Sequence, residues 1–195
     1  MKKNIIILLI LGLIFTNYFS VNAQQVERNY VVIEFATATW GPFCQGAAMG
    51  ANDLFVNGHQ VAIINNQMTD DFTSPASTSR LNYYGINTIP RAIFDGGNEI
   101  EGGSLTTSLY SVYNPVSDNL INTMSDFTID LSYTNTGLDY DVIINITEPG
   151  NYTGTNLVVH LFLTESNIPH SWYSLNEVNF VNRAMYPNEN GSAYT

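Results

Sequence analysis

Residues 30–55 read YVVIEFATATWGPFCQGAAMGANDLF, and the rest of the chain is organised around this stretch. Tyr30 to Phe35 is a nearly continuous apolar run, typical of a β-strand that is covered on both faces. From Pro42 the apolar spacing becomes helical. Pro42 fits the first turn of a helix and Gly41 is acceptable as its N-cap. We therefore predict a strand, a turn at residues 39–42 and a helix that carries the only cysteine, Cys44.

The segments that follow predict an α/β domain. Asn57-Gly58 ends the helix, and Gln60 to Ile64 (QVAII) is a second apolar strand. A strand, a helix and a strand in this order form a βαβ unit, whose strands are parallel and whose crossover is right-handed. The later elements expected in this part are a short helix over 77–84, a strand over 86–94 with Pro90 at its start or at an edge, a hairpin turn over 95–98 and a helix over 104–124.

The pattern changes at about Ser125. Residues 127–133, 140–146 and 156–163 alternate apolar and polar side chains, which predicts an antiparallel meander and the start of a β-sandwich. Residues 164–195 look like a loop. Because three strands make a poor free-standing domain, we expect the all-β segment 125–195 to be an incomplete C-terminal domain.

The first 23 residues have the pattern of a signal peptide. Lys2 and Lys3 precede an apolar run over residues 5–15, and Val21-Asn22-Ala23 offers small residues for cleavage. The run is too short to favour a membrane-spanning helix. We expect a mature chain that begins near Gln24, is exported to the periplasm, outer membrane or exterior, and has no integral membrane span after signal removal.

Charge and cysteine content narrow the function classes. Without Lys2 and Lys3, four arginines face 17 acidic residues, a net charge of −13, which makes nucleic-acid binding improbable. One cysteine cannot form an internal disulfide bond. Cys44 is therefore either a buried structural thiol or a thiol that is open to an outside partner. Because it shares a helix face with Ala48 and Ala51, we expect it to be shielded.

The order of these elements resembles a thioredoxin-like domain. The stretch Glu34 to Trp40 is followed four residues later by Cys44, then by the βαβ crossover, and Ile89-Pro90 opens a strand that runs into the Asp95-Gly96 hairpin. More narrowly, the chain resembles the outer-membrane-protein-twenty-eight-related family of exported Gram-negative proteins. The residues that carry this second resemblance are Asp71-Phe72, Arg80 to Gly85 and Asn182 to Ala184.

The resemblance implies a fold and a domain order. It implies a thioredoxin-like domain over 24–124, with a central mixed sheet flanked by helices, after the signal peptide (1–23) and before the β-rich segment 125–195. It also implies that Pro90 is cis and lies beside the cysteine position, where the preceding backbone pairs with an extended peptide. The implied groove consists of Trp40, Gly41, Pro42, Phe43, Ile89 and Pro90.

The chain departs from the family in its chemistry. Active members carry Trp-Cys-x-x-Cys, whereas the four residues after Trp40 are Gly41-Pro42-Phe43-Cys44. Gly41 stands where the attacking cysteine belongs, and only the resolving position, Cys44, is kept. A dithiol oxidoreductase needs both sulfurs, one to attack as a thiolate and one to release the mixed disulfide.

Two functional hypotheses follow. The first is a non-catalytic binding or structural protein that holds an extended peptide or an envelope protein in the groove. The second is a weak monothiol oxidoreductase that uses Cys44 with an external thiol. Neither needs a cofactor. We expect no metal site, because His59, His160 and His170 lack the short spacings of a metal motif. Trp40 has two open interpretations, a platform for a peptide or a cap over the start of the helix.

Overall fold

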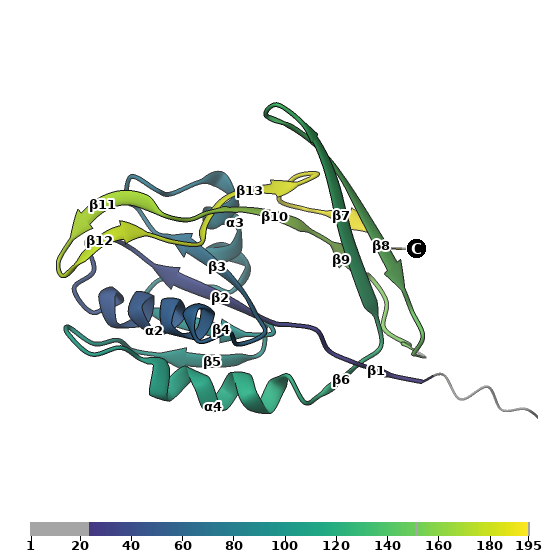
Figure 1. The fold of residues 1–195 in the computed structure, drawn as a ribbon, viewed down its shortest axis with the longest axis horizontal. Coiled ribbons are helices and arrows are strands. Elements are labelled where there is room, and N and C mark those ends of the chain that lie inside the picture. Colours follow the sequence, from purple (N-terminus) through teal and green to yellow (C-terminus); the bar gives the residue numbers. More distant parts are fainter. Residues whose placement is uncertain (1–23, 151, 195) are drawn as a thin grey trace, which may run out of the picture. The chain divides into compact units, whose positions relative to one another are not determined.

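The computed structural model describes residues 24–150 and 152–194, and the predicted signal peptide lies outside the described residues. The described chain divides into two compact units, one of residues 24–26 and 126–150 and one of residues 27–125 and 152–194. The second unit is a mixed α/β structure on a six-stranded sheet with the strand order β10-β13-β3-β2-β4-β5 (Figure 1). Its sheet strands are β2 (Val31–Thr37), β3 (Val61–Gln67), β4 (Arg91–Phe94), β5 (Asn98–Glu101), β10 (Leu161–Glu165) and β13 (Val181–Tyr186).

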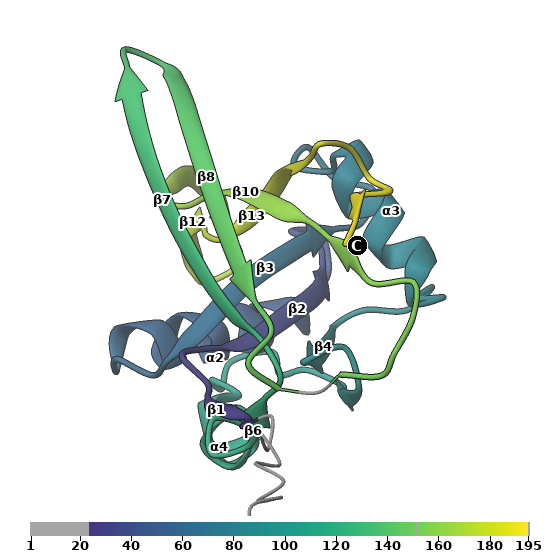
Figure 2. The ribbon, with the colours of Figure 1, turned by 90° about the vertical axis from the view of Figure 1, so that its right-hand side faces the viewer.

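Three helices cover the two faces of this sheet. They are α2 (Cys44–Val56), α3 (Pro75–Tyr83) and α4 (Tyr110–Leu120). Figure 2 shows α2 and α4 on one side of β2 and β3 and α3 on the other. The remaining short strands are β1 (Val26–Glu27), β6 (Met124–Ser125), β9 (Val158–Val159), β11 (Ile168–Trp172), β12 (Leu175–Val178) and β14 (Ser192–Ala193). None of the helices formed by residues 24–150 and 152–194 has the length and apolar character that a membrane crossing needs.

The predicted βαβ unit is confirmed, and its strands β2 and β3 are the two central strands of the sheet. β2 and β3 are parallel, paired from Val31↔Val61 to Thr37↔Gln67, and α2 connects them. Alternate residues of β2 point to opposite faces: Ile33 and Phe35 pack with α2 and α4, and Ala36 packs with Leu81 of α3. β2 is therefore covered on both faces along its second half, whereas Val32 near its start is exposed, so the predicted cover of both faces holds only in part.

Several element bounds differ from the prediction. α2 begins at Cys44 instead of Pro42, because residues 38–44 form two successive turns, closed by Gly41 N–H to Ala38 O (3.2 Å) and Cys44 N–H to Gly41 O (3.0 Å). β3 continues through Asn65-Asn66-Gln67, three residues beyond its predicted end at Ile64. These polar residues stay in the ladder because β2 pairs with them up to Gln67.

The helix predicted over 104–124 is shorter, and α4 covers only residues 110–120. The preceding segment runs past the start of α2 instead. Ser104 N–H donates to Phe43 O (3.1 Å), Gly46 N–H donates to Ser104 O (3.1 Å), and Leu109 N–H donates to Gly46 O (3.0 Å). This close approach needs a glycine at position 46, since a Cβ there would lie 2.7 Å from the Ser104 side chain. α3 begins at Pro75, two residues before the predicted start, because Ser74 accepts a hydrogen bond from Ser77 N–H and caps the helix.

The expected domain boundary at residue 125 does not match the observed sheet. β10 and β13, from the segment predicted to be a separate all-β domain, pair with each other and extend the first sheet beside β3. The predicted loop over 164–195 is not observed, since the described residues 164–194 contain β11, β12, β13 and β14. Burial and a backbone hydrogen bond hold β13 beside β3. Val181 is fully buried, and Asn65 N–H donates to Phe180 O (2.7 Å).

The first unit contains an antiparallel hairpin of β7 (Thr128–Thr136) and β8 (Asp139–Thr147). The predicted pairing of these two strands is confirmed, but the third predicted strand, 156–163, divides into β9, which pairs with β14, and the start of β10, which belongs to the six-stranded sheet. The register of the β7–β8 hairpin places apolar side chains opposite one another on one face: Ile129↔Ile146, Leu131↔Ile144 and Tyr133↔Val142. Several of these side chains are exposed, and Leu138 at the turn is 94% exposed.

A buried polar network ties the α3 face of the sheet together. The guanidinium of Arg80 donates to both carboxylate oxygens of Glu34, at 2.8 and 2.6 Å, and Tyr84 OH donates to Glu34 Oε1 at 2.7 Å. Asn66 donates to Glu34 Oε2, and Asn182 donates to Asn66 Oδ1. The network therefore connects β2, β3, β13 and α3 through one carboxylate that is almost wholly buried.

Candidate functional site

The single thiol lies at the first residue of α2, where the turn after β2 delivers it. Cys44 is 0% exposed and unpaired. Its shielding, predicted from the helix face that it shares with Ala48 and Ala51, is confirmed. The residues packed around it come from several elements, and they are Ala48, Phe72, Ile89, Ile168, Trp172, Leu175, Val178 and Val181.

The β11–β12 hairpin provides four of these eight residues. Trp172, which is only 7% exposed, packs in the Cys44 cluster, and its indole N–H donates to Glu177 O (3.1 Å) within the hairpin. The hairpin is also attached to the turn below it. Tyr173 OH donates to Trp40 O (2.6 Å), and Ser174 OH donates to Gln45 Oε1 (2.6 Å). The two acceptors, Trp40 and Gln45, lie on either side of Cys44 in the sequence. The hairpin is therefore bonded to the chain before and after the thiol that it covers.

Burial has an electrostatic consequence for the thiol. Removal from water raises the pKa of Cys44 above its ordinary value, and the nearby carboxylate of Asp70 raises it further. The thiolate is the nucleophilic form of cysteine. Cys44 is therefore held in its unreactive form as well as out of reach.

Gly41, at the position of the missing cysteine, is itself buried. A Cβ built on it would lie 2.6 Å from Cys44 Sγ, closer than real Cβ contacts occur. The sulfur thus occupies the space that a side chain at position 41 would need. Gly41 is a packing requirement of the site in its present form.

The structure brings some of the predicted groove residues together and separates others. Ile89 packs in the Cys44 cluster, and the Ile89–Pro90 peptide bond is cis. Phe43 and Pro90 meet across Gly103, where any Cβ would overlap the Phe43 carbonyl oxygen. Trp40, Pro42 and Phe43 are exposed, whereas Gly41 and Pro90 are buried and Ile89 is half-buried.

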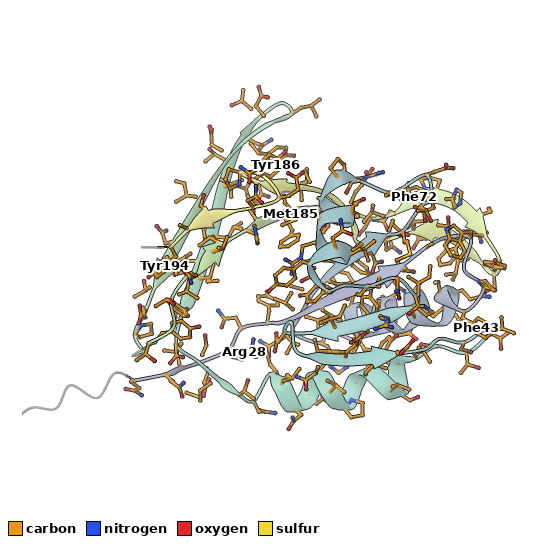
Figure 3. All side chains as sticks on the ribbon, turned by 180° about the vertical axis from the view of Figure 1, so that it is seen from behind. Arg28, Phe43, Phe72, Met185, Tyr186 and Tyr194 are labelled. Carbon is orange, nitrogen blue, oxygen red and sulfur yellow. The ribbon has the colours of Figure 1, made fainter. Side chains whose placement is uncertain are left out.

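The exposed part of the predicted groove is an apolar rim. Trp40 is 53% exposed and Phe43 is 52% exposed, with Pro42 between them. Figure 3 shows Phe43 at the outer end of α2. Trp40 also lines a hollow of about 440 Å³ together with Asp70, Asp71 and His170, and none of the other predicted groove residues lines that hollow. Its indole N–H donates to Met68 O (3.1 Å), so one edge of the ring is fixed while much of it stays in solvent.

Sequence reasoning missed the residues that close the site. Phe72 was noted only as part of a resemblance, yet it packs against Cys44 and contacts His170 edge-on at 5.0 Å. Asp70 accepts hydrogen bonds from Thr39 N–H (2.9 Å) and from its own loop, which fixes the turn that precedes Trp40. Trp172 lies in a segment predicted to be a loop, and no local pattern ties it to position 44. Within the described residues, no group of three or more His, Cys, Asp or Glu side chains is arranged to hold a metal ion.

Comparison with known proteins yields one structural likeness. No family model matches the chain, and no curated protein sequence matches it. Among solved structures, the chain is similar to HBP35 of Porphyromonas gingivalis, with a TM-score of 0.68 and 14% sequence identity. The match covers 88% of this chain and 61% of HBP35, so the chain spans about three fifths of that protein's length. At this identity the likeness concerns the fold alone.

Proposed function

We propose that this chain is an exported, redox-degenerate thioredoxin-like protein of the bacterial envelope that binds an extended peptide and does not turn over disulfides. One observation carries the proposal: the only thiol is fully buried beneath the β11–β12 hairpin, and its required partner position is a glycine. The thioredoxin-like assignment is supported by the parallel β2–α2–β3 unit, the antiparallel β4–β5 hairpin and the fold likeness to HBP35.

The monothiol alternative has less support. A monothiol enzyme needs an accessible thiolate that can attack an external disulfide. Burial removes Cys44 from solvent, which prevents access by an external disulfide. It also raises the pKa of Cys44, which disfavours the thiolate. A role for Cys44 as a small apolar core residue fits its packing better.

The proposed binding surface is the rim of Trp40, Pro42 and Phe43. Exposed aromatic side chains beside an unpaired backbone segment are a common way to hold an extended peptide. Ile89 supplies the backbone, because none of the hydrogen bonds formed among the described residues uses its N–H or C=O. The net charge of −13 favours neutral or basic peptides over acidic ones.

Two assays test the redox part. The native protein should react slowly with a thiol reagent and quickly after denaturation, and it should show no insulin-reduction activity. Rapid native labelling, or turnover that Cys44→Ser removes, would overturn the proposal. Gly41→Cys should introduce turnover only together with Trp172→Ala, because a side chain at position 41 meets Cys44 Sγ and the hairpin covers the thiol. A folded double variant that stays inactive would count against the scaffold having held a dithiol site.

A binding assay tests the peptide part. Trp40 fluorescence should change on titration with a panel of short unstructured peptides, and Phe43→Ala should weaken the tightest of them. Tyr30→Ala is the matched control, since Tyr30 is an equally exposed aromatic residue at the opposite end of β2. Equal loss in both variants, or no peptide binding at all, would refute the rim as a peptide site. Export is tested separately by sequencing the N-terminus of the mature protein from a Gram-negative host, which should begin near Gln24.

A further inference from the structure

A second site lies beside the covered thiol and does not depend on the proposed peptide rim. It is a cavity of about 110 Å³ between β3, α2 and the β11–β12 hairpin. The side chains that matter for its chemistry are Gln67, Asp53, Glu177, Trp172, Phe180 and Met49. An apolar cavity of about 150 Å³ can hold a benzene molecule, so this smaller cavity has room for a ligand of about four or five heavy atoms.

Two buried polar atoms of the cavity wall, Gln67 Oε1 and Thr37 Oγ1, have no hydrogen-bond partner. Gln67 is 2% exposed, and its amide oxygen can only accept a hydrogen bond. The two preceding amides on the same strand are paired: Asn65 donates to Asn179 O (2.6 Å), and Asn66 donates to Glu34. A buried acceptor without a donor costs folding free energy, and buried amides are almost always satisfied. An occupant of the cavity that carries a hydrogen-bond donor would satisfy Gln67.

The charge around the cavity selects the kind of donor. Asp53 and Glu177 line it, and no Arg, Lys or His does. Asp53 accepts a hydrogen bond from Ser108 and Glu177 accepts one from Asn179, but neither carboxylate forms an ion pair within the described part of the chain. The wall is therefore negative and rich in acceptors. Its apolar part contains two aromatic rings, Trp172 and Phe180, which also favour a cation.

We propose that this cavity binds a small amphipathic primary ammonium ion. An ammonium group donates to Gln67 Oε1 and carries the positive charge that Asp53 and Glu177 lack. A short hydrocarbon chain lies against Met49 and Trp172. A neutral alcohol could satisfy Gln67 alone, and an anion would be repelled by both carboxylates, so the site should distinguish these three ligand classes.

The experiment uses Trp172 as its reporter. In a Trp40→Phe background the protein contains one tryptophan, which lines the cavity. We would titrate it with n-butylammonium, 1-butanol and butyrate at constant ionic strength. The expected result is a dissociation constant at least tenfold lower for n-butylammonium than for 1-butanol, with butyrate weaker still.

Matched variants connect the binding to the named residues. Gln67→Met removes the unpaired amide at nearly constant volume, so the fold should be kept while n-butylammonium affinity falls at least tenfold. Asp53→Asn and Glu177→Gln should each lower the affinity several-fold. Glu189→Gln, an exposed residue outside the cavity, changes the net charge equally and should have no effect.

Three outcomes would overturn the proposal. They are equal binding of the amine and the alcohol, no fluorescence change with either, and unaltered amine affinity in folded Gln67→Met. The second outcome would indicate a cavity that holds water only. If Asp53→Asn or Glu177→Gln unfolds the protein, the Gln67→Met titration still decides the question.

Discussion

Replacing Trp172 by alanine tests whether the β11–β12 hairpin is the cover that keeps Cys44 unreactive. Trp172 packs in the Cys44 cluster and is almost wholly buried. Truncation of a buried tryptophan to alanine typically costs about 3–5 kcal/mol. The same change removes the indole N–H that donates to Glu177 O, which helps to hold the hairpin in shape.

The expected rate change follows from this cost. A buried thiol is labelled only through open states, so its rate scales with the population of those states. Each 1.36 kcal/mol is a factor of ten. If the whole cost falls on opening of the hairpin, Trp172→Ala should accelerate native labelling of Cys44 by about 160- to 5,000-fold. Rates of a chromogenic thiol reagent at several reagent concentrations would measure this change.

A matched control separates local opening from global unfolding. Glu34→Ala should cost a similar free energy, about 3–5 kcal/mol, because it leaves the buried Arg80 unpaired on the other face of the sheet. If the hairpin opens locally, this variant should leave the labelling rate near that of the wild type. Equal acceleration in both variants would show that only global unfolding exposes the thiol, and the role assigned to the hairpin would be refuted.

Three further changes have defined outcomes. Tyr113→Phe should raise the free energy of unfolding by about 1 kcal/mol in urea denaturation, since the Tyr113 hydroxyl is buried without a partner. Gly103→Ala should lower the melting temperature strongly, because its Cβ would overlap the Phe43 carbonyl; an unchanged value would contradict that packing. Burial and the neighbouring Glu34 raise the pKa of Tyr84 above that of a tyrosine in the unfolded chain, about 10. The contribution of Tyr84 to the free energy of unfolding is therefore complete below about pH 10. It declines at higher pH, because the unfolded state ionises first. Tyr84→Phe should flatten the loss of stability above that pH, as measured by denaturation at a series of alkaline pH values.

The parts of the fold that sequence predicted are those with local patterns. The apolar run of β2, the helical spacing after Pro42 and the Asp95–Asn98 turn each depend on neighbouring residues, and all three are observed. The predicted end of β3 at Ile64 is wrong. Asn65, Asn66 and Gln67 are polar, and polar residues indicate a loop unless a partner strand is known. Here the partner is β2 on one side and the buried network on the other.

The non-local pairings could not be read in this way. β13 joins β3 in parallel after a long excursion of the chain, and the alternation of β10 is equally compatible with an edge strand of this sheet and with a sandwich. The same limit applies to the site. The shielding of Cys44 was predicted because Ala48 and Ala51 share its helix face, whereas Trp172 covers it from a distant hairpin with no periodic relation to α2.

The absent side chain at position 41 and the covered thiol are parts of one arrangement. Cys44 Sγ fills the space beside Gly41, and the hairpin is bonded to the residues on either side, to Trp40 through Tyr173 and to Gln45 through Ser174. A side chain at position 41 would push the sulfur towards the cluster that Trp172 closes. Exchange chemistry would thus require a second sulfur and also a displaced hairpin. The exposed rim of Trp40 and Phe43 needs neither change, and for that reason we propose binding and not exchange at this site.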